Sequence, residues 1–176
     1  MAWTSPYTFA TGEAVPAAEL NAMLRDNMNE QAPAKATTRG SYFVSTGPNT
    51  IAERGFKEAF TGAGFNLSTM ETWTSVADGP ELEVTHGGQL LVLFAARIYM
   101  FAVGGEASVA PAVVGKAGAS INHAIRHSGD NTDLLRSYSF HLFTGLGAGT
   151  DTVRLEYHTE TQQARFHQRQ LLVMPL

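Results

Sequence analysis

The sequence predicts a mainly β protein, in which a C-terminal β-sandwich or jelly roll follows an extended N-terminal arm and one short α-helix. Three observations favour this fold class. Only 16% of the residues are charged, well below the roughly 25% of an average soluble domain. Glycine accounts for 17 of the 176 residues, and Gly, Asp and Pro breaks separate many short apolar stretches. Several of these stretches alternate between apolar and polar residues, which is the period of a half-buried strand.

Length and composition exclude several classes of protein. A chain of 176 residues fits one domain, or one domain with a small appendage. The absence of cysteine excludes a disulfide framework, a thiolate metal site and a cysteine nucleophile. A net charge of −4 without a basic run argues against a general nucleic-acid-binding protein. The first residues lack the features of a signal peptide, and the apolar run 90–101 is too short to span a membrane as a helix.

Residues 1–33 are expected to form an attachment arm followed by the helix. Prolines and a glycine disfavour a regular element before residue 16, and the aromatic side chains of the arm need a surface to pack on. Pro16 suits a first helical turn, and Pro33 ends a helix that we expect over residues 16–31. A helix of this length is marginal alone in water, so its apolar stripe should pack on its own domain or on copies of itself. The stripe consists of Leu20, Met23, Leu24 and Met28.

Residues 34–72 are expected to form a connecting segment that contains one short strand. The strand is predicted at 41–46, and the Gly-Pro-Asn sequence at 47–49 is typical of a turn. We expect a helical turn over 53–60 and a loop in the glycine-rich sequence that follows it.

Residues 73–176 are expected to form the sandwich itself. Turn signals separate short strands, as in sandwiches and jelly rolls. The alternation is clearest in two apolar sets, which are Val153, Leu155 and Tyr157, and Tyr138, Phe140 and Leu142. The predicted strands are Thr72–Val76, Leu82–Val84, Gln89–Phe101, Ser108–Val114, Ser137–Thr144, Thr152–Thr159, Ala164–His167 and Arg169–Met174.

The histidines and glycines do not form a recognisable catalytic or metal-binding motif. His123 and His127 are four residues apart, as zinc ligands on a helix are, but Ala124 stands where a zincin motif has glutamate. We therefore expect them to be loop or strand histidines. The glycines of Gly145–Gly149 follow one predicted strand and precede another, whereas a dinucleotide site needs a helix there. A hairpin loop is the expected structure of this segment.

The carboxylates and tryptophans also have simple expected roles. Glycosidases use two carboxylates across a groove, but Glu81, Glu83 and Glu106 all lie beside predicted turns, where solvated loop charges are expected. Trp73 is expected to begin the sandwich core, and Trp3 is a candidate anchor to a partner. The sequence thus predicts no enzyme activity, no cofactor and no bound metal.

The N-terminal residues carry a resemblance to a known group of proteins. The sequence reads Ala-Trp-Thr-Ser-Pro-Tyr-Thr-Phe at 2–9 and Thr-Gly-Glu-Ala-Val at 11–15, followed by Leu-Asn at 20–21 and Arg-Asp-Asn at 25–27. This order resembles the N-terminus of short virion proteins of tailed bacteriophages, of the minor tail, tail fibre or head fibre type. Pro16 departs from the pattern, because these proteins usually have threonine there.

Later segments extend the resemblance. Ala-Thr-Thr-Arg-Gly at 36–40 with Thr-Gly-Pro-Asn-Thr-Ile-Ala at 46–52 is similar to a segment that is common in phage fibres. The sequences at 88–97, 152–157 and 169–176 resemble the compact β knobs of the same class. Residues 53–72 match no part of the pattern, which leaves the connection between helix and knob undefined.

The resemblance implies a non-enzymatic virion protein, displayed on the particle surface, with an N-terminal attachment segment and an exposed knob of the jelly-roll or TNF-like kind. Such knobs are typically trimers, so a homotrimer is expected. Its other expected partners are tail or major capsid proteins and a host-surface glycan or receptor, with neither nucleic acid nor membrane insertion. Synthesis is expected in the host cytoplasm, without a signal peptide. The candidate attachment residues are Trp3, Pro6, Tyr7 and Phe9, and the candidate oligomerisation residues are Leu20, Met23, Leu24 and Met28.

Other interpretations stay open at this point. A capsid decoration protein or a head fibre on the major capsid lattice fits the resemblance as well as a tail protein does. A glycan-acting spike enzyme is a remote alternative, because no motif for it is evident. The β pattern also permits a cellular TNF-like or lectin-like binding module, but the phage-like N-terminus argues against that class.

Overall fold

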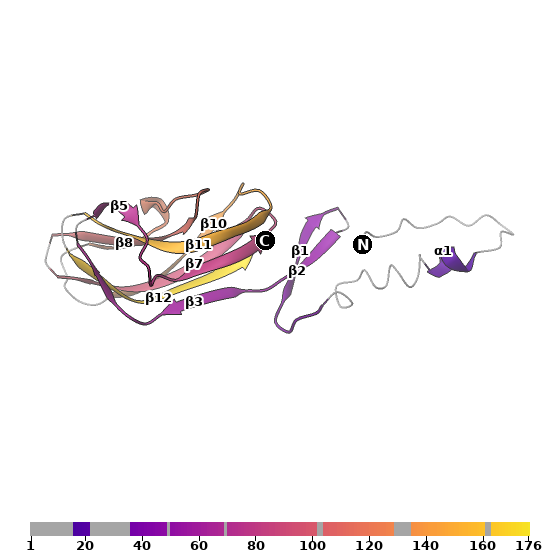
Figure 1. The fold of residues 1–176 in the computed structure, drawn as a ribbon, viewed down its shortest axis with the longest axis horizontal. Helices are drawn as coiled ribbons and strands as arrows, with labels where there is room; N and C mark the ends of the chain where they lie inside the picture. The colour runs from indigo at the N-terminus through magenta and orange to yellow at the C-terminus, as the bar shows by residue number, and fades with distance from the viewer. Residues whose placement is uncertain are drawn as a thin grey trace. The chain divides into compact units, whose positions relative to one another are not determined.

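A computed structural model of the chain describes residues 16–21, 36–48, 50–68, 70–101, 104–128, 135–160 and 163–176. The chain divides into two compact units, Met1–Gly55 and Phe56–Leu176 (Figure 1). The described residues are mainly β, with one short α-helix, α1 (Ala17–Asn21), and one 3₁₀ turn, η2 (Ile121–His123). α1 lies within the helix predicted over 16–31. The rest of that helix and the predicted arm lie outside the described residues.

The first unit contains a β-hairpin of β1 (Tyr42–Gly47) and β2 (Thr50–Arg54). The two strands are antiparallel, with Tyr42 opposite Arg54 and a register shift between Ser45 and Gly47. This confirms the strand predicted at 41–46. The helical turn predicted over 53–60 is wrong, because these residues extend into β2 and into β3 (Lys57–Thr61), which is paired in the second unit.

A carboxylate fixes the loop in front of this hairpin. Glu53 on β2 accepts hydrogen bonds from the backbone N–H of Thr37 and Thr38, at 3.0 and 2.8 Å, and from the hydroxyl groups of Thr37 and Ser41. These bonds favour the ionised form, beginning with the Ser41 hydroxyl, and lower the pKa of Glu53 to about 2. The loop is therefore held by one ionised side chain.

The second unit is built from two five-stranded antiparallel sheets. The first, called here the β7–β12 sheet, has the order β10-β7-β12-β3, and β4 also pairs with β12. The second, called the β8–β11 sheet, has the order β5-β11-β8-β9, and β6 also pairs with β11. The strands not yet defined are β4 (Phe65–Leu67), β5 (Met70–Thr74), β6 (Glu81–His86), β7 (Leu90–Met100), β8 (Glu106–Val113), β9 (Ile125–Ser128), β10 (Leu135–Phe143), β11 (Gly149–Thr159) and β12 (Ala164–Pro175).

The connectivity is that of a jelly roll. Strand pairs are nested along the chain: β8 pairs with β9, β7 with β10, β5 and β6 with β11, and β3 and β4 with β12. Successive members of this nested hairpin belong to opposite sheets, which rolls the hairpin into a two-layer sandwich (Figure 1). The prediction of a mainly β protein with a jelly-roll sandwich is confirmed.

The strands of the sandwich differ from the predicted set in three ways. β3 and β4 come from the predicted connecting segment, and both pair with β12. β9 lies where no strand was predicted. The two strands predicted on either side of residue 168 form one strand, in which Gln168 takes a left-handed conformation (φ 43°) at an irregularity in the pairing with β7. A bulge of this kind lets a strand continue after one extra residue.

The core lies between the sheets and holds the apolar set predicted on β11. Val153, Leu155 and Tyr157 are all buried. β10 alternates between an inner and an outer face, as predicted, but its inner face is the one with buried Phe143, and the apolar set is exposed. The alternation of residues along a strand shows only that its two faces differ. The strands with which it pairs decide which face turns toward the core.

One buried residue of the core is a cation. Arg169 is 1% exposed, and its guanidinium lies 4.7 Å from the centre of the Phe65 ring. It donates to the Ala63 carbonyl at 3.1 Å and to the Tyr157 hydroxyl at 3.4 Å. Burial raises the pKa of Tyr157 to about 12, so this phenol stays neutral. Arg169 is thus held by an aromatic ring and neutral oxygens.

Candidate functional site

The outer face of the β7–β12 sheet carries exposed apolar side chains. On this face Phe140 of β10 lies opposite Leu93 of β7, and Leu93 lies opposite Leu172 of β12. In the next row on the same face, two residue pairs further along, Tyr138 lies opposite Ala95. Side chains two residues apart share a face of a strand, so the two rows form one continuous surface. We call it the apolar face, made of Phe60, Leu91, Leu93, Ala95, Tyr138, Phe140, Leu142, Leu172 and Met174.

The exposure of this surface is unusual for large apolar side chains. Phe140 is 70% exposed, Tyr138 64%, Phe60 58%, Leu142 46% and Leu93 40%. Single exposed apolar residues are ordinary, but a contiguous group marks an interaction surface or an aggregation hazard. Burial of one such side chain stabilises a protein by about 1.5–3 kcal/mol. A partner that covers this face therefore gains from several residues at once.

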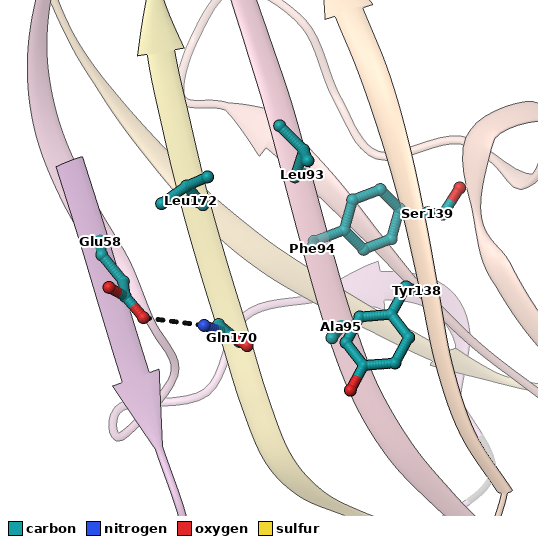
Figure 2. A pocket seen from close by; sticks show the side chains of 8 residues that line it. All are labelled: Glu58, Leu93, Phe94, Ala95, Tyr138, Ser139, Gln170 and Leu172. Atoms are coloured by element: carbon teal, nitrogen blue, oxygen red, sulfur yellow. Dashed lines mark hydrogen bonds between the residues drawn. The ribbon is translucent and has the colours of Figure 1, made fainter. Parts of the chain in front are cut away.

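A shallow hollow of about 230 Å³ lies in the apolar face (Figure 2). Its polar rim includes Glu58 on β3, whose carboxylate accepts a hydrogen bond from the Gln170 side-chain amide at 2.7 Å. This bond occupies one carboxylate oxygen, and the Glu58 side chain is exposed to solvent. The hollow is lined by Glu58, Leu93, Phe94, Ala95, Tyr138, Ser139, Gln170 and Leu172.

The outer face of the β8–β11 sheet is different, because ion pairs cover it. The Arg126 guanidinium donates to Glu106 at 2.8 and 2.5 Å, and Arg154 donates to Glu156 at 3.0 and 2.6 Å. The hydrogen bond from Arg126 lowers the pKa of Glu106. Trp73 of β5 is half-buried, with its ring 5.4 Å from that of His158. Trp73 thus lies against a histidine ring in a tilted arrangement and is not among the fully buried core residues, contrary to the expectation.

The two histidines considered as zinc ligands are not on a common helix. His123 belongs to η2 and His127 to β9. The His123 ring stacks on His141 with centroids 3.9 Å apart, and burial lowers the pKa of both rings, which favours their neutral forms at pH 7. The described residues contain no group of three His, Asp or Glu side chains placed to hold a metal ion.

The structure also separates the three carboxylates considered for glycoside hydrolysis. Glu81 and Glu83 lie on β6, while Glu106 lies on β8. β6 and β8 pair with opposite edges of β11, and Glu106 is bound to Arg126. This placement gives no support to a carboxylate pair across a groove.

The glycine-rich loop Gly145–Gly149 was expected to be a hairpin loop, and this is wrong. It connects β10 in one sheet with β11 in the other, so it crosses between layers. The local sequence shows a break between two strands but cannot show that the strands belong to different sheets.

A polar cluster that sequence reasoning missed ties together the loops at one end of the sandwich. His86 donates from Nε2 to Asp151 at 2.8 Å, while its Nδ1 accepts from the Gly88 N–H at 3.0 Å. Lys116 bonds to the same Asp151 oxygen at 2.8 Å and to the Leu146 carbonyl at 3.0 Å, and its hydrogen bond lowers the pKa of Asp151. Because both ring nitrogens are engaged, this histidine fixes loops and is not placed as a general base.

Most site residues predicted from the sequence lie outside the described residues. These include the attachment residues Trp3, Pro6, Tyr7 and Phe9, and the stripe residues Met23, Leu24 and Met28. Leu20 falls in α1, but its side chain is not described. Both the attachment role and the oligomerisation role of these residues stay predictions.

One sequence signal could have found the apolar face. β7 reads Leu-Leu-Val-Leu-Phe-Ala-Ala-Arg-Ile-Tyr-Met, so both of its faces are largely apolar. A strand that is apolar on both faces indicates a sheet covered on both sides. In a two-layer sandwich the opposite sheet covers only one side, so an apolar outer side is left exposed.

Comparisons with known proteins give fold likenesses at low identity. No family model and no curated protein matches the chain. The VP2 subviral particle of infectious bursal disease virus aligns with a TM-score of 0.49 at 10% identity, over 75% of this chain and 37% of that chain. Eiger TNF from S. frugiperda aligns with a TM-score of 0.41 at 12% identity, over 70% of this chain and 94% of that one. This chain thus spans little more than a third of the VP2 chain, and the resemblance to tailed-phage proteins stays a prediction. Among the described residues, no helix has the length and apolarity needed to cross a membrane.

Proposed function

We propose that this chain is a non-enzymatic structural protein of a bacteriophage virion, displayed on the particle surface as a homotrimer of the tail fibre or minor tail type. Its N-terminal segment attaches it to the particle, and its jelly roll is the exposed knob. The N-terminal sequence pattern supports the virion assignment. The apolar face is the observation that carries the assembly, because a sheet face with such exposure needs another protein surface to cover it.

The chemistry of the apolar face favours a second copy of this chain as the partner. Permanent interfaces between identical subunits are more apolar than transient ones, and aromatic side chains are enriched in them. Phe140 and Tyr138 supply two exposed aromatic rings near the centre of the face. Closed cyclic symmetry is the common outcome of self-association, and the resemblance to trimeric knobs selects three subunits.

The electrostatics of the face permit its burial. Burial of an unpaired charge is costly, but Glu58 lies at the rim, where its carboxylate is exposed to solvent. The hydrophobic residues around it carry no charge to desolvate. A copy that packs on this face therefore meets mainly apolar surface.

A capsid decoration protein or head fibre is the alternative, because the same knob on the major capsid lattice needs the same assembly. Purified protein is mixed with matching particles that lack it, and the particles are imaged by electron cryomicroscopy. Density at the tail or at a unique vertex supports the proposal, while regular density over the lattice supports the alternative. Absence of bound density on any particle contradicts both.

A variant of the N-terminal segment makes this experiment specific. Trp3→Ala is expected to lose particle binding while the jelly roll keeps its unfolding temperature, because Trp3 belongs to the attachment segment. Val114→Asp is the control variant, which carries a substitution in the sandwich and not in the N-terminal segment. Val114 is exposed in the turn after β8 and lies away from the apolar face. Equal binding by both variants would contradict the attachment role of Trp3.

The predicted helix stripe offers a second source of trimer contacts. If three stripes form a bundle that holds the trimer, Leu24→Asp leaves folded monomers, because a charge enters the bundle core. A trimer that persists in this variant assigns the assembly to the apolar face. Native mass spectrometry distinguishes the two results.

A further inference from the structure

Next to the apolar face, the same side of the β7–β12 sheet becomes basic. Arg97 of β7 lies directly opposite His167 of β12. Arg165 precedes His167 by two residues and therefore shares its side of the strand. Gly64, between β3 and β4, packs against both: a Cβ atom there would lie 2.5 Å from His167 Nδ1 and 3.0 Å from Arg165 Nε. The His167 and Arg165 side chains therefore converge beside this glycine.

The positive charges of this cluster lack a negative partner within the described residues. The ion pairs of that part of the chain involve other side chains. The Arg97 Nη1 atom makes one long hydrogen bond, 3.5 Å to the Gln168 side-chain oxygen, and its Nε is buried without a hydrogen-bond partner. Burial and the charges of Arg165, Arg97 and Arg169 all lower the pKa of His167.

This arrangement is unfavourable unless an anion completes it. Arg97 and Arg165 both lie near enough to His167 to lower its pKa, so two guanidinium charges gather around one ring. A buried donor without an acceptor adds the cost of its lost hydration. The chain as a whole carries a net charge of −4, so a local excess of arginine is not a general property of its surface. The guanidinium group presents paired N–H donors that match the oxygens of phosphate, sulfate and carboxylate.

We infer that Arg97, Arg165 and His167 form a binding site for a tetrahedral oxyanion, a phosphate or sulfate group. The Arg97 and Arg165 guanidinium groups donate to its oxygens, and His167 lines the site beside Gly64. The same chemistry recognises the free ion and a phosphate or sulfate group carried by a glycan. This site goes beyond the proposed function. It does not depend on that function, because all three side chains belong to the sandwich of a single chain and no second subunit is needed.

Calorimetric titration of the whole chain with inorganic phosphate tests the site. The ionic strength is held constant with sodium chloride, because phosphate also stabilises proteins without binding to a site. Arg165→Gln is the main variant, since Arg165 is exposed and its loss leaves the core intact. Arg97→Gln is the second variant. Arg126→Gln on the opposite sheet is the matched control, because it also removes one exposed arginine.

The site predicts saturable phosphate binding by the wild-type chain and by Arg126→Gln. Loss of one charge-assisted contact weakens binding about tenfold or more, so both Arg165→Gln and Arg97→Gln are expected to show this loss. Absence of saturable binding by the wild-type chain would overturn the inference. Equal affinity of all four proteins would overturn it as well, because the ion would then bind elsewhere.

Sugar phosphates distinguish the two sources of the anion. Glucose 6-phosphate and glucose 6-sulfate are titrated against free phosphate and sulfate, with glucose as the uncharged control. Tighter binding of the sugar esters assigns the site to an anionic glycan. Equal or weaker binding assigns it to the free ion.

Discussion

The two outer faces of the sandwich expose opposite kinds of side chain. On the β8–β11 sheet, Arg126 pairs with Glu106 and Arg154 with Glu156, so charged side chains form the surface. On the β7–β12 sheet, Phe140 and its neighbours stand in the same kind of position with 70% of the Phe140 side chain exposed. The first face is complete in a single chain. The second exposes large apolar side chains, and it is the face on which we propose that the subunits assemble.

A substitution in the core between the two sheets is expected to have the largest effect on stability. Phe166 is fully buried, stacked on Phe65 at 5.4 Å and against Tyr157 at 4.9 Å. Phe166→Ala is expected to lower the free energy of unfolding by about 3–5 kcal/mol, because it removes buried surface and leaves a cavity. Urea unfolding measures this. A loss below about 1 kcal/mol would contradict the assignment of Phe166 to a closely packed core.

A substitution on the apolar face is expected to affect assembly more than folding. Phe140→Ser removes a central aromatic contact, and such contacts contribute about 2 kcal/mol or more to association. The stability of the separate subunit should change by no more than about 0.5 kcal/mol, because the side chain is exposed there. The wild-type melting temperature should rise with protein concentration, and that of Phe140→Ser should not. Concentration dependence in both proteins would contradict the role of Phe140.

An ion pair on the polar face has a smaller expected effect. Glu106→Gln is expected to reduce stability by roughly 0.2–1 kcal/mol, since Arg126 is half exposed and screened by solvent. The pKa of Glu106 is lowered in the folded chain. Its contribution is therefore present above the ordinary carboxyl pKa and is lost as the pH falls through the lowered folded value.

Unfolding of Glu106→Gln across the acid range measures that dependence. The exposed Glu81, which makes no ion pair within the described residues, supplies the control Glu81→Gln. Equal pH dependence of the two variants would show that the Glu106 pair contributes nothing.

The smallest expected effect concerns the loop of the first unit. Glu53 has a pKa of about 2 through its hydrogen bonds to Ser41, Thr37 and Thr38. Its hold on the loop is complete above the ordinary carboxyl pKa and is lost as the pH falls through about 2. Glu53→Gln should speed amide exchange at Thr37 and Thr38 at neutral pH and leave the sandwich unchanged. Unchanged exchange at both amides would contradict this role.

The fold class could be predicted from the sequence because its signals are local. Strands that alternate, such as the one with Val153, Leu155 and Tyr157, show their buried side directly. β3 and β4 could not be found in this way, because their pairing partner β12 lies about a hundred residues further along, as the Glu58–Gln170 hydrogen bond shows. Long-range pairing overrides weak local preference.

The candidate site could be predicted only in part for the same reason. Tyr138, Phe140 and Leu142 were recognisable as one set, but only the register with β7 shows that they face outward. The opposition of Arg97 and His167 likewise depends on the pairing of two distant strands. The attachment residues of the arm rest on sequence resemblance alone.

Native mass spectrometry of the whole chain tests the central claim most directly. Three proteins are compared: the wild-type chain, Phe140→Asp on the apolar face, and Val114→Asp at an exposed apolar position outside it. We expect the mass of three chains for the wild type and for Val114→Asp, and the mass of one folded chain for Phe140→Asp. A monomeric wild-type chain, or a trimer that survives Phe140→Asp, would contradict assembly through this face.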